Sequence, residues 1–107
     1  MKEISAKIRN FSEERDWEQF HNPKDLVIAL NIEASELLES FLWKHHDDVD
    51  IREIRDELAD VFIYAIMIAE KYGLDINTII EDKIALNRER YPVDKARGKA
   101  IKYDKLG

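Results

Sequence analysis

The stretch that decides the fold is residues 51–73, IREIRDELADVFIYAIMIAEKYG. Apolar residues recur in it every three or four positions, which predicts a helix that begins near Ile51. Gly73 would end this helix, because glycine readily adopts the left-handed conformation that is common just beyond a helix end. From Val61 to Ala69 the helix is apolar on every side, and such a segment must be buried all round. A protomer this small covers only one face of each helix, so the pattern indicates a partner subunit packed against Val61 to Ala69.

Three further amphipathic helices are predicted around this segment. Asn22 and Asp75 are good N-cap residues for two of them, and Pro23 suits a first helical position. We therefore expect an all-α fold, with a four-helix-bundle-type protomer completed by oligomerisation. The three helices should span about residues 2–15, 22–43 and 75–90.

The chain should form one helical domain, residues 1–92, followed by a basic C-terminal tail, residues 93–107. Pro92 stops the last helix, since proline cannot continue it. Five lysine and arginine residues follow with little periodicity, which is typical of an extended tail. No internal repeat indicates a second domain.

The composition excludes several classes of function. With no cysteine among 107 residues, disulfides, thiolate metal sites and a cysteine nucleophile are impossible. A net charge of −6 argues against binding to a nucleic-acid polymer, which requires a basic surface. The longest uncharged apolar run, Val61 to Ala69, is far shorter than the ~20 residues of a membrane-spanning helix. We expect a cytoplasmic protein without membrane contact.

Two pairs of acidic residues indicate a possible metal site. Glu33 and Glu36 lie three residues apart, and Glu57 and Asp60 repeat that spacing on the next predicted helix. Side chains three apart lie on one helical face, so two antiparallel neighbours would bring all four carboxylates together. Because four anions repel one another, a divalent cation would relieve the conflict. An all-oxygen ligand set favours Mg²⁺, with Mn²⁺ as a possible substitute.

The same acids have a simpler interpretation as solvated surface charges, because acidic pairs at this spacing are common on helices. A ferritin-like di-iron site would require Glu-x-x-His motifs on the helices that carry the acids, and no histidine follows Glu33, Glu36 or Glu57 at that spacing. His45 and His46 are expected on the surface of a polar loop, residues 44–50. Trp43 and Tyr64 follow the acids by one or two helical turns, where they could stack on a base or serve as core aromatics. Lys83 and Asn87 could reach phosphates or belong to a solvated face.

The chain resembles the MazG-like nucleotide pyrophosphohydrolases, and within them the dCTP pyrophosphatase group. The superfamily pattern Glu-x-x-Glu, spacer, Glu-x-x-Asp is met by the two acidic pairs. The more specific motifs span nearly the whole chain: Glu14-Arg-Asp-Trp-Glu-Gln-Phe-His21, Trp43-Lys44, Asp60-Val-Phe-Ile-Tyr64, Asn87-Arg-Glu-Arg-Tyr-Pro92 and Arg97-Gly-Lys-Ala-Ile-Lys-Tyr103.

The resemblance implies a homodimer or homotetramer that holds Mg²⁺ through the four acids. It also implies a set of substrate-binding residues and a phosphate-binding pair on the last helix, Lys83 and Asn87. One departure is Ile8, where relatives carry a histidine, and this puts the base preference in doubt. The residues implied for the nucleoside pocket are Trp17, Glu18, Gln19, Phe20, His21, Trp43 and Tyr64.

The expected function is Mg²⁺-dependent cleavage of a nucleoside triphosphate, dCTP or a modified dCTP, to monophosphate and pyrophosphate. Glu33 or Glu36 would activate the attacking water. Two related alternatives are an all-helical dUTPase and a broad house-cleaning pyrophosphatase. A third, from another class, is a noncatalytic helical oligomerisation module.

Overall fold

The computed structural model describes residues 2–106, and these contain helices and no strands. The expected all-α class is therefore confirmed. The chain divides into two units, Met1–Leu74 and Asp75–Gly107. The elements of the first unit are α1 (Lys2–Glu14), the 3₁₀ helix η1 (Glu18–Phe20), α2 (Pro23–Glu39) and α3 (Ile51–Lys71). Those of the second are α4 (Ile76–Arg90), α5 (Val93–Ala96) and the 3₁₀ helix η2 (Tyr103–Lys105).

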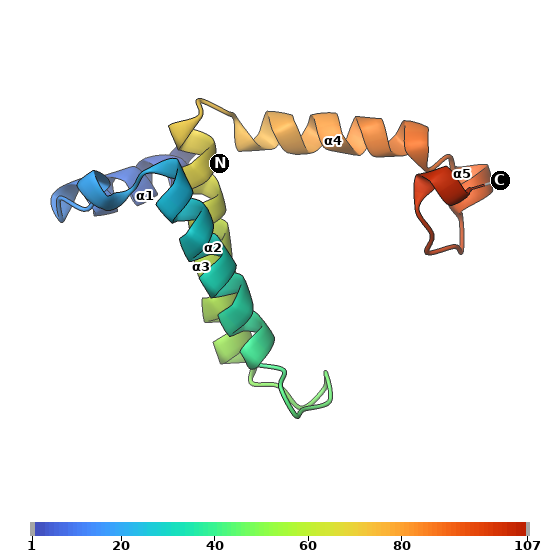
Figure 1. Cartoon of the computed structure of the whole chain (residues 1–107), viewed down its shortest axis with the longest axis horizontal. Coiled ribbons are helices and arrows are strands. Elements are labelled where there is room, and N and C mark those ends of the chain that lie inside the picture. The colour runs from blue at the N-terminus through green and yellow to red at the C-terminus, as the bar shows by residue number, and fades with distance from the viewer. Residues whose placement is uncertain (1, 107) are drawn as a thin grey trace. The chain divides into compact units, whose positions relative to one another are not determined.

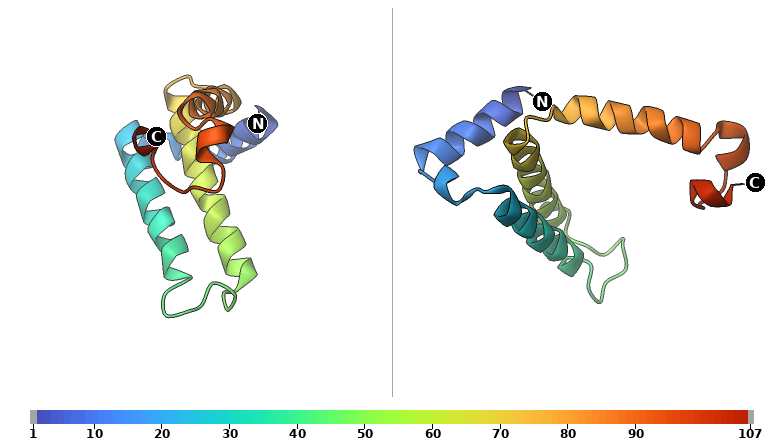
Figure 2. Two further views of the ribbon diagram at one scale, coloured as in Figure 1. Left: turned by 90° about the vertical axis from the view of Figure 1, so that its right-hand side faces the viewer. Right: turned by 45° about the horizontal axis from the view of Figure 1, so that its top comes forward.

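The helices α2 and α3 form an antiparallel pair that is the centre of the first unit (Figures 1 and 2). Leu26 on α2 and Ile66 and Ala69 on α3 are the buried hydrophobic residues in the described part of the chain. The helix α1 packs against α3, where Arg9 pairs with Glu70 at 3.4 Å. This small core holds α2 and α3 side by side and so fixes the relative positions of the acids they carry.

Side-chain caps begin the long helices where the sequence predicts them. The Asn22 carboxamide oxygen accepts a hydrogen bond from the Asp25 N–H at 2.9 Å, and Pro23 follows as the first helical residue. Asp75 accepts from the Thr78 N–H at 3.0 Å and caps α4 in the same way. Each cap satisfies a backbone donor that the first helical turn leaves without a partner.

The end of α3 is also as predicted. Gly73 has a φ of +64°, and the Leu74 N–H donates to the Ala69 carbonyl at 2.9 Å. This is the Schellman arrangement, which requires a left-handed residue after the helix.

The second helix ends earlier than predicted. It was expected to reach about Trp43, but α2 ends at Glu39 and the chain continues in turns. Ser40 is buried, and its hydroxyl donates to the Glu53 carboxylate on α3 at 2.9 Å. Trp43 has a φ of +63°, a conformation that no helix interior accommodates. Trp43 therefore follows the helix and is fully exposed, rather than lying on its acidic face.

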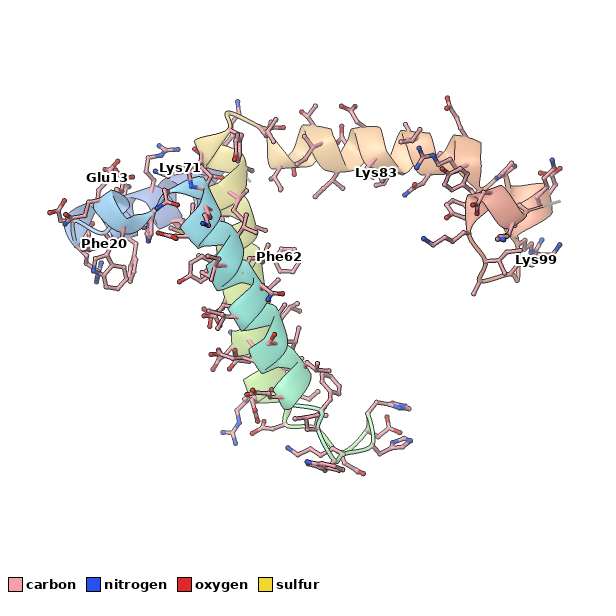
Figure 3. The ribbon with its side chains drawn as sticks, in the orientation of Figure 1. Glu13, Phe20, Phe62, Lys71, Lys83 and Lys99 are labelled. Carbon is pink, nitrogen blue, oxygen red and sulfur yellow. The ribbon has the colours of Figure 1, made fainter. Side chains whose placement is uncertain are left out.

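The first unit leaves much of its apolar surface uncovered. Phe62, which projects from α3 in Figure 3, is 55% exposed, although the sequence pattern predicts that this segment is buried all round. Val27, Ile32 and Leu38 on α2 are exposed to a similar degree. These are side chains that the expected partner subunit would cover.

The second unit corrects the expectation of an extended tail. Residues after Pro92 form the short helix α5 and then η2. The Tyr103 ring packs edge-to-face on Tyr91, with 6.1 Å between ring centroids, and the Arg90 guanidinium lies 4.4 Å from the Tyr103 ring centroid. The basic residues thus belong to a segment that folds back on the end of α4. Within residues 2–106, no helix combines the length and the apolar composition needed to cross a membrane.

Replacing Ser40 with alanine should lower the free energy of unfolding by about 1–2 kcal/mol, because the Glu53 carboxylate would lose a charge-assisted hydrogen bond between α2 and α3. Urea denaturation at fixed protein concentration measures this. The matched control is Ser35→Ala, since the Ser35 hydroxyl bonds only within α2, to the Asn31 carbonyl. Equal losses in the two variants would contradict the proposed contribution of the Ser40–Glu53 contact.

Candidate functional site

Three of the four predicted acids meet between α2 and α3. One carboxylate oxygen from each of Glu33, Glu36 and Glu57 lies within 4.8 Å of the other two. Glu33 and Glu36 come from one face of α2, because side chains three residues apart share a face. Glu57 comes from the facing side of α3. The antiparallel pairing of the two helices therefore produces the cluster that the spacing in the sequence predicts.

Two carboxylate oxygens in this cluster are buried without a hydrogen-bond partner, Oε2 of Glu33 and Oε2 of Glu57. An unpaired buried charge is costly, and proteins normally pair it or coordinate it to a metal. No arginine or lysine forms an ion pair with either residue among those found in residues 2–106. The cluster therefore has unsatisfied acceptor oxygens at its centre.

The electrostatics of the cluster follow from this burial. Burial raises the pKa of the Glu33 carboxyl to about 7, and the adjacent Glu36 carboxyl and then Asp60 and Glu57 act in the same direction. The pKa of Glu57 is raised as well, first by burial and then by the nearby Glu36 charge. Asp60, the fourth predicted acid, is thus close enough to act on both. The protein without a cation favours protonation of these groups.

Tyr64 lies beside the acids, as its spacing from Asp60 predicts. Burial raises the pKa of the Tyr64 phenol, and the negative charges of Glu33, Asp60 and Glu36 raise it further. A phenol that stays protonated is a hydrogen-bond donor at neutral pH. Tyr64 therefore presents a donor and an aromatic ring next to the carboxylates.

A groove of about 410 Å³ opens beside Asp60 and Tyr64. It brings Tyr64 together with Trp17 and His21, three residues that the resemblance assigns to the nucleoside pocket. Its volume is in the range of small-molecule sites. The remaining lining residues come from α1 and α3, and they are Lys7, Ile8, Phe11, Ser12, Ile63 and Met67.

Trp17 owes its place to the end of α1. Asp16 has a φ of +54°, and the Trp17 N–H donates to the Ser12 carbonyl at 3.0 Å, which closes the same Schellman arrangement as at the end of α3. The turn directs the Trp17 ring back onto Phe11, with 5.6 Å between ring centroids. The sequence predicts the helix end near residue 15, and α1 ends at Glu14, but a left-handed aspartate in place of glycine gives little signal for the turn that follows.

The structure separates the other residues of the 17–21 segment. Glu18 lines a smaller neighbouring hollow of about 210 Å³, which also contains His21. The Gln19 carboxamide donates to the Asp16 carbonyl at 2.9 Å and to its carboxylate at 3.0 Å, so it supports the turn. Phe20 is 63% exposed and does not line the groove.

Trp43 is absent from this groove. It follows the C-terminal end of α2, whereas His21 precedes the N-terminal end, and the 17 residues of α2 span about 25 Å at 1.5 Å per residue. Trp43 therefore lies far from His21 and does not line the groove of its own chain.

The groove also includes Phe11 and Ser12, which the sequence did not assign to a site. Ile8, Phe11 and Ser12 lie on one face of α1 at helical spacing, and Ser12 is only 3% exposed. The periodicity was visible in the sequence, but it is equally typical of a helix that packs on a core. Lys83 and Asn87 lie on α4 in the second unit, where Lys83 is exposed and Asn87 is half-buried.

The first unit combines a cluster of carboxylates with an aromatic groove. The carboxylates Glu33, Glu36 and Glu57 offer oxygen ligands to a hard divalent ion. The adjacent groove offers aromatic rings and polar edges to a flat ligand. A molecule with an anionic part and an aromatic part could occupy both.

Comparison with known proteins gives a consistent result. The profile of the MazG-like family matches residues 28–106. The dCTP pyrophosphatase 1 of Mus musculus is 37% identical, in an alignment that covers 99% of this chain and 67% of the relative, and that of Homo sapiens is 35% identical over the same shares. The crystal structure of a pyrophosphatase from Archaeoglobus fulgidus superposes with a TM-score of 0.77 at 30% identity, covering 86% of this chain and 92% of that one.

The family profile covers most of the chain, including all four acids, and the relatives align over nearly its full length. The shared fold extends to a solved structure at substantial sequence identity. The chain belongs to the MazG-like family.

Proposed function

We propose that this protein is a Mg²⁺-dependent nucleoside triphosphate pyrophosphohydrolase. The observation that carries the proposal is the cluster of Glu33, Glu36 and Glu57, with two buried oxygens that have no partner, beside an aromatic groove. The names of the relatives, dCTP pyrophosphatase 1 and pyrophosphatase, support the same reaction. The noncatalytic alternative gives no reason to bury unpaired carboxylates.

The donor set fits the proposed ion. Mg²⁺ is bound by a few carboxylates together with substrate phosphates and waters, and Mn²⁺ accepts similar ligands. Glu33, Glu36, Glu57 and Asp60 are the residues that would hold it. When bound, the ion would neutralise charge on the phosphate chain and on the carboxylates and make the attacking water more acidic.

The reaction follows from the chemistry of the triphosphate. The oxygen of a water attacks the α-phosphorus, and the bond from that phosphorus to the oxygen bridging to the β-phosphate breaks. The products are a nucleoside monophosphate and pyrophosphate. Glu33 or Glu36 accepts the water proton. The raised pKa of the Glu33 carboxyl makes its carboxylate a stronger base than an ordinary glutamate.

The groove would hold the nucleoside. Trp17 supplies an exposed aromatic ring for stacking, and His21 and the Tyr64 phenol supply polar edge contacts. We propose dCTP or a modified dCTP as the substrate, following the relatives' name. The groove contains Ile8, where the resemblance to the family implies a histidine, so one polar contact to the base would be missing.

A second copy of the chain would complete the site. The exposed apolar faces of α2 and α3 provide a surface for it, and the fully exposed Trp43 is beyond the reach of its own groove. We propose a homodimer or homotetramer in which Trp43 of one copy enters the groove of another. Lys83 and Asn87 would bind the phosphates.

Pyrophosphate release from a panel of dNTPs and NTPs, with Mg²⁺ and with EDTA, tests the activity. We expect Mg²⁺-dependent release that is fastest with dCTP, and Glu36→Gln should lower kcat by about 10²- to 10³-fold through loss of transition-state charge stabilisation. Glu39→Gln is the matched control, because Glu39 is on α2 and outside the cluster. Absence of release with every nucleotide, from a folded protein, would favour the noncatalytic module, and dUTP as the fastest substrate would indicate a dUTPase.

Trp17→Ala should raise KM for the best substrate by roughly tenfold, because stacking of a base on an aromatic ring contributes about 1–3 kcal/mol. Steady-state kinetics over a range of substrate concentrations measures this. Tyr72→Ala is the control, since Tyr72 is an exposed aromatic outside the groove and should change KM less than twofold. An unchanged KM in Trp17→Ala would remove Trp17 from the nucleoside site.

The raised pKa of Glu33 predicts how stability depends on pH when no cation is bound. The folded state holds the proton on this carboxyl more tightly than the unfolded chain does. The resulting stabilisation is fully present below the ordinary pKa of 4.5 and is lost as the pH rises through about 7.

In EDTA, the unfolding free energy of the wild type relative to Glu33→Gln should therefore fall between pH 5 and pH 8. Mg²⁺ at pH 8 should restore stability to the wild type more than to the variant, because it binds the ionised carboxylate. Urea denaturation measures both effects. Parallel pH profiles for the two proteins would contradict the assignment of the raised pKa to Glu33.

A further inference from the structure

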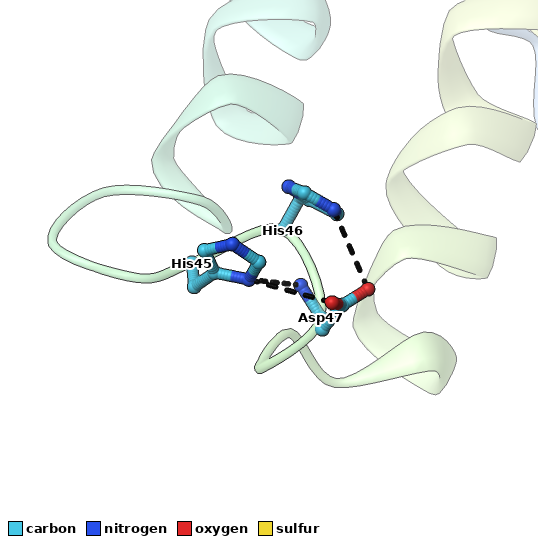
Figure 4. A network of polar contacts seen from close by, with 3 residues as sticks. All are labelled: His45, His46 and Asp47. Carbon is cyan, nitrogen blue, oxygen red and sulfur yellow. Dashed lines mark hydrogen bonds and ion pairs between the residues drawn. The ribbon is translucent and has the colours of Figure 1, made fainter.

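The loop between α2 and α3 contains a second group of side chains of the kinds that bind metal ions. It includes two imidazoles, whereas the acidic cluster offers carboxylates alone. His45, His46 and Asp47 are consecutive, and one ligand atom from each lies within 4.8 Å of the other two. The two imidazole rings lie together, with centroids 4.1 Å apart and an angle of 33° between the ring planes. Figure 4 shows that both rings approach the same carboxylate.

The separations match those of a metal site better than those of hydrogen bonds. His45 Nδ1 lies 3.5 Å from Asp47 Oδ2, and His46 Nε2 lies 3.5 Å from Asp47 Oδ1. Hydrogen bonds between nitrogen and oxygen are shorter, about 2.7–3.2 Å. Two ligand atoms that are each about 2.1 Å from a tetrahedral Zn²⁺ lie about 3.4 Å apart. Each histidine nitrogen therefore lies at the separation from a carboxylate oxygen that two ligands of one ion would have, and the two histidines face different oxygens of Asp47.

The backbone holds the three side chains on one turn. The Asp48 N–H donates to the His45 carbonyl at 2.9 Å and closes the turn around His46 and Asp47. The Asp47 N–H donates to the lone pair of His45 Nδ1 at 3.2 Å, which orients the ring, and an ion bound at this nitrogen would replace that hydrogen bond. Preorganised donors lose less conformational entropy when a ligand binds.

The charge and the donor types indicate which ion the turn would bind. Residues 44–50 contain one lysine and three aspartates, so the loop attracts cations. Two imidazoles and one carboxylate suit Zn²⁺, Ni²⁺ or Cu²⁺, whereas Mg²⁺ prefers oxygen ligands alone. Water would fill the remaining positions, because all three side chains are exposed to solvent.

We propose that His45, His46 and Asp47 form a Zn²⁺-binding site that is separate from the acidic cluster. It holds one ion per chain through a nitrogen of each histidine and an oxygen of Asp47. Because binding uses neutral imidazoles, protons compete with the ion. The site does not depend on the proposed catalytic function, since none of its ligands belongs to the groove or the cluster.

Isothermal titration of untagged protein with Zn²⁺, in excess Mg²⁺ to occupy the acids, tests the proposal. We expect one Zn²⁺ per chain and at least a tenfold loss of affinity in both His46→Gln and Asp47→Asn. His21→Gln and Glu36→Gln are the controls, because they remove a histidine and a carboxylate from outside the loop, and they should bind Zn²⁺ as the wild type does.

A spectroscopic measurement locates the ion independently. Amide chemical shifts of residues 44–50 should change on addition of Zn²⁺, and this change should vanish in His46→Gln. Equal Zn²⁺ affinity in the wild type and the loop variants would overturn the proposal. So would a loss of Zn²⁺ binding in Glu36→Gln alone, which would assign the ion to the acidic cluster.

Discussion

The close approach of carboxylates from two helices is the constraint that the rest of the structure must offset. Glu33 and Glu57 bury oxygens without partners between α2 and α3, although the same helices must pack to form the core. Repulsion and burial both act against this pairing, as the raised pKa of Glu33 records. A divalent cation would reverse the balance, because the carboxylates would become its ligands. Folding and the proposed cation binding are therefore coupled at one place.

The pairing of α2 and α3 withstands this repulsion because other contacts hold the two helices together. Leu26 and Ile66 pack in its core, and the Ser40–Glu53 hydrogen bond joins the end of α2 to the start of α3. These contacts lie on both sides of the acidic cluster along the pair. The apolar side chains around Phe62 are exposed, and the proposed second copy would cover them. Stability and the completion of the nucleoside site would then both come from the same association.

The acidic cluster and the turn at His45–Asp47 differ both in ligand type and in exposure to solvent. The acidic cluster offers oxygen atoms in a partly buried space, which suits a hard ion that also contacts phosphates. The turn at His45–Asp47 offers nitrogen and oxygen on the surface, which suits a borderline ion. Ligand type alone would direct different ions to the two places, even though both sites lie on one helical hairpin.

The sequence by itself determined the helices and the acids, because hydrophobic periodicity, caps such as Asn22 and i, i+3 spacing are local properties of the chain. It also indicated Trp17, His21 and Tyr64, through motifs that resemble a known family. Only the tertiary structure decided that Trp43 leaves its helix and is absent from the groove, that Phe20 stays outside it, and that the residues after Pro92 fold back on α4. These outcomes depend on left-handed residues such as Trp43 and on contacts such as Tyr91–Tyr103, between positions that are not neighbours in any helical repeat.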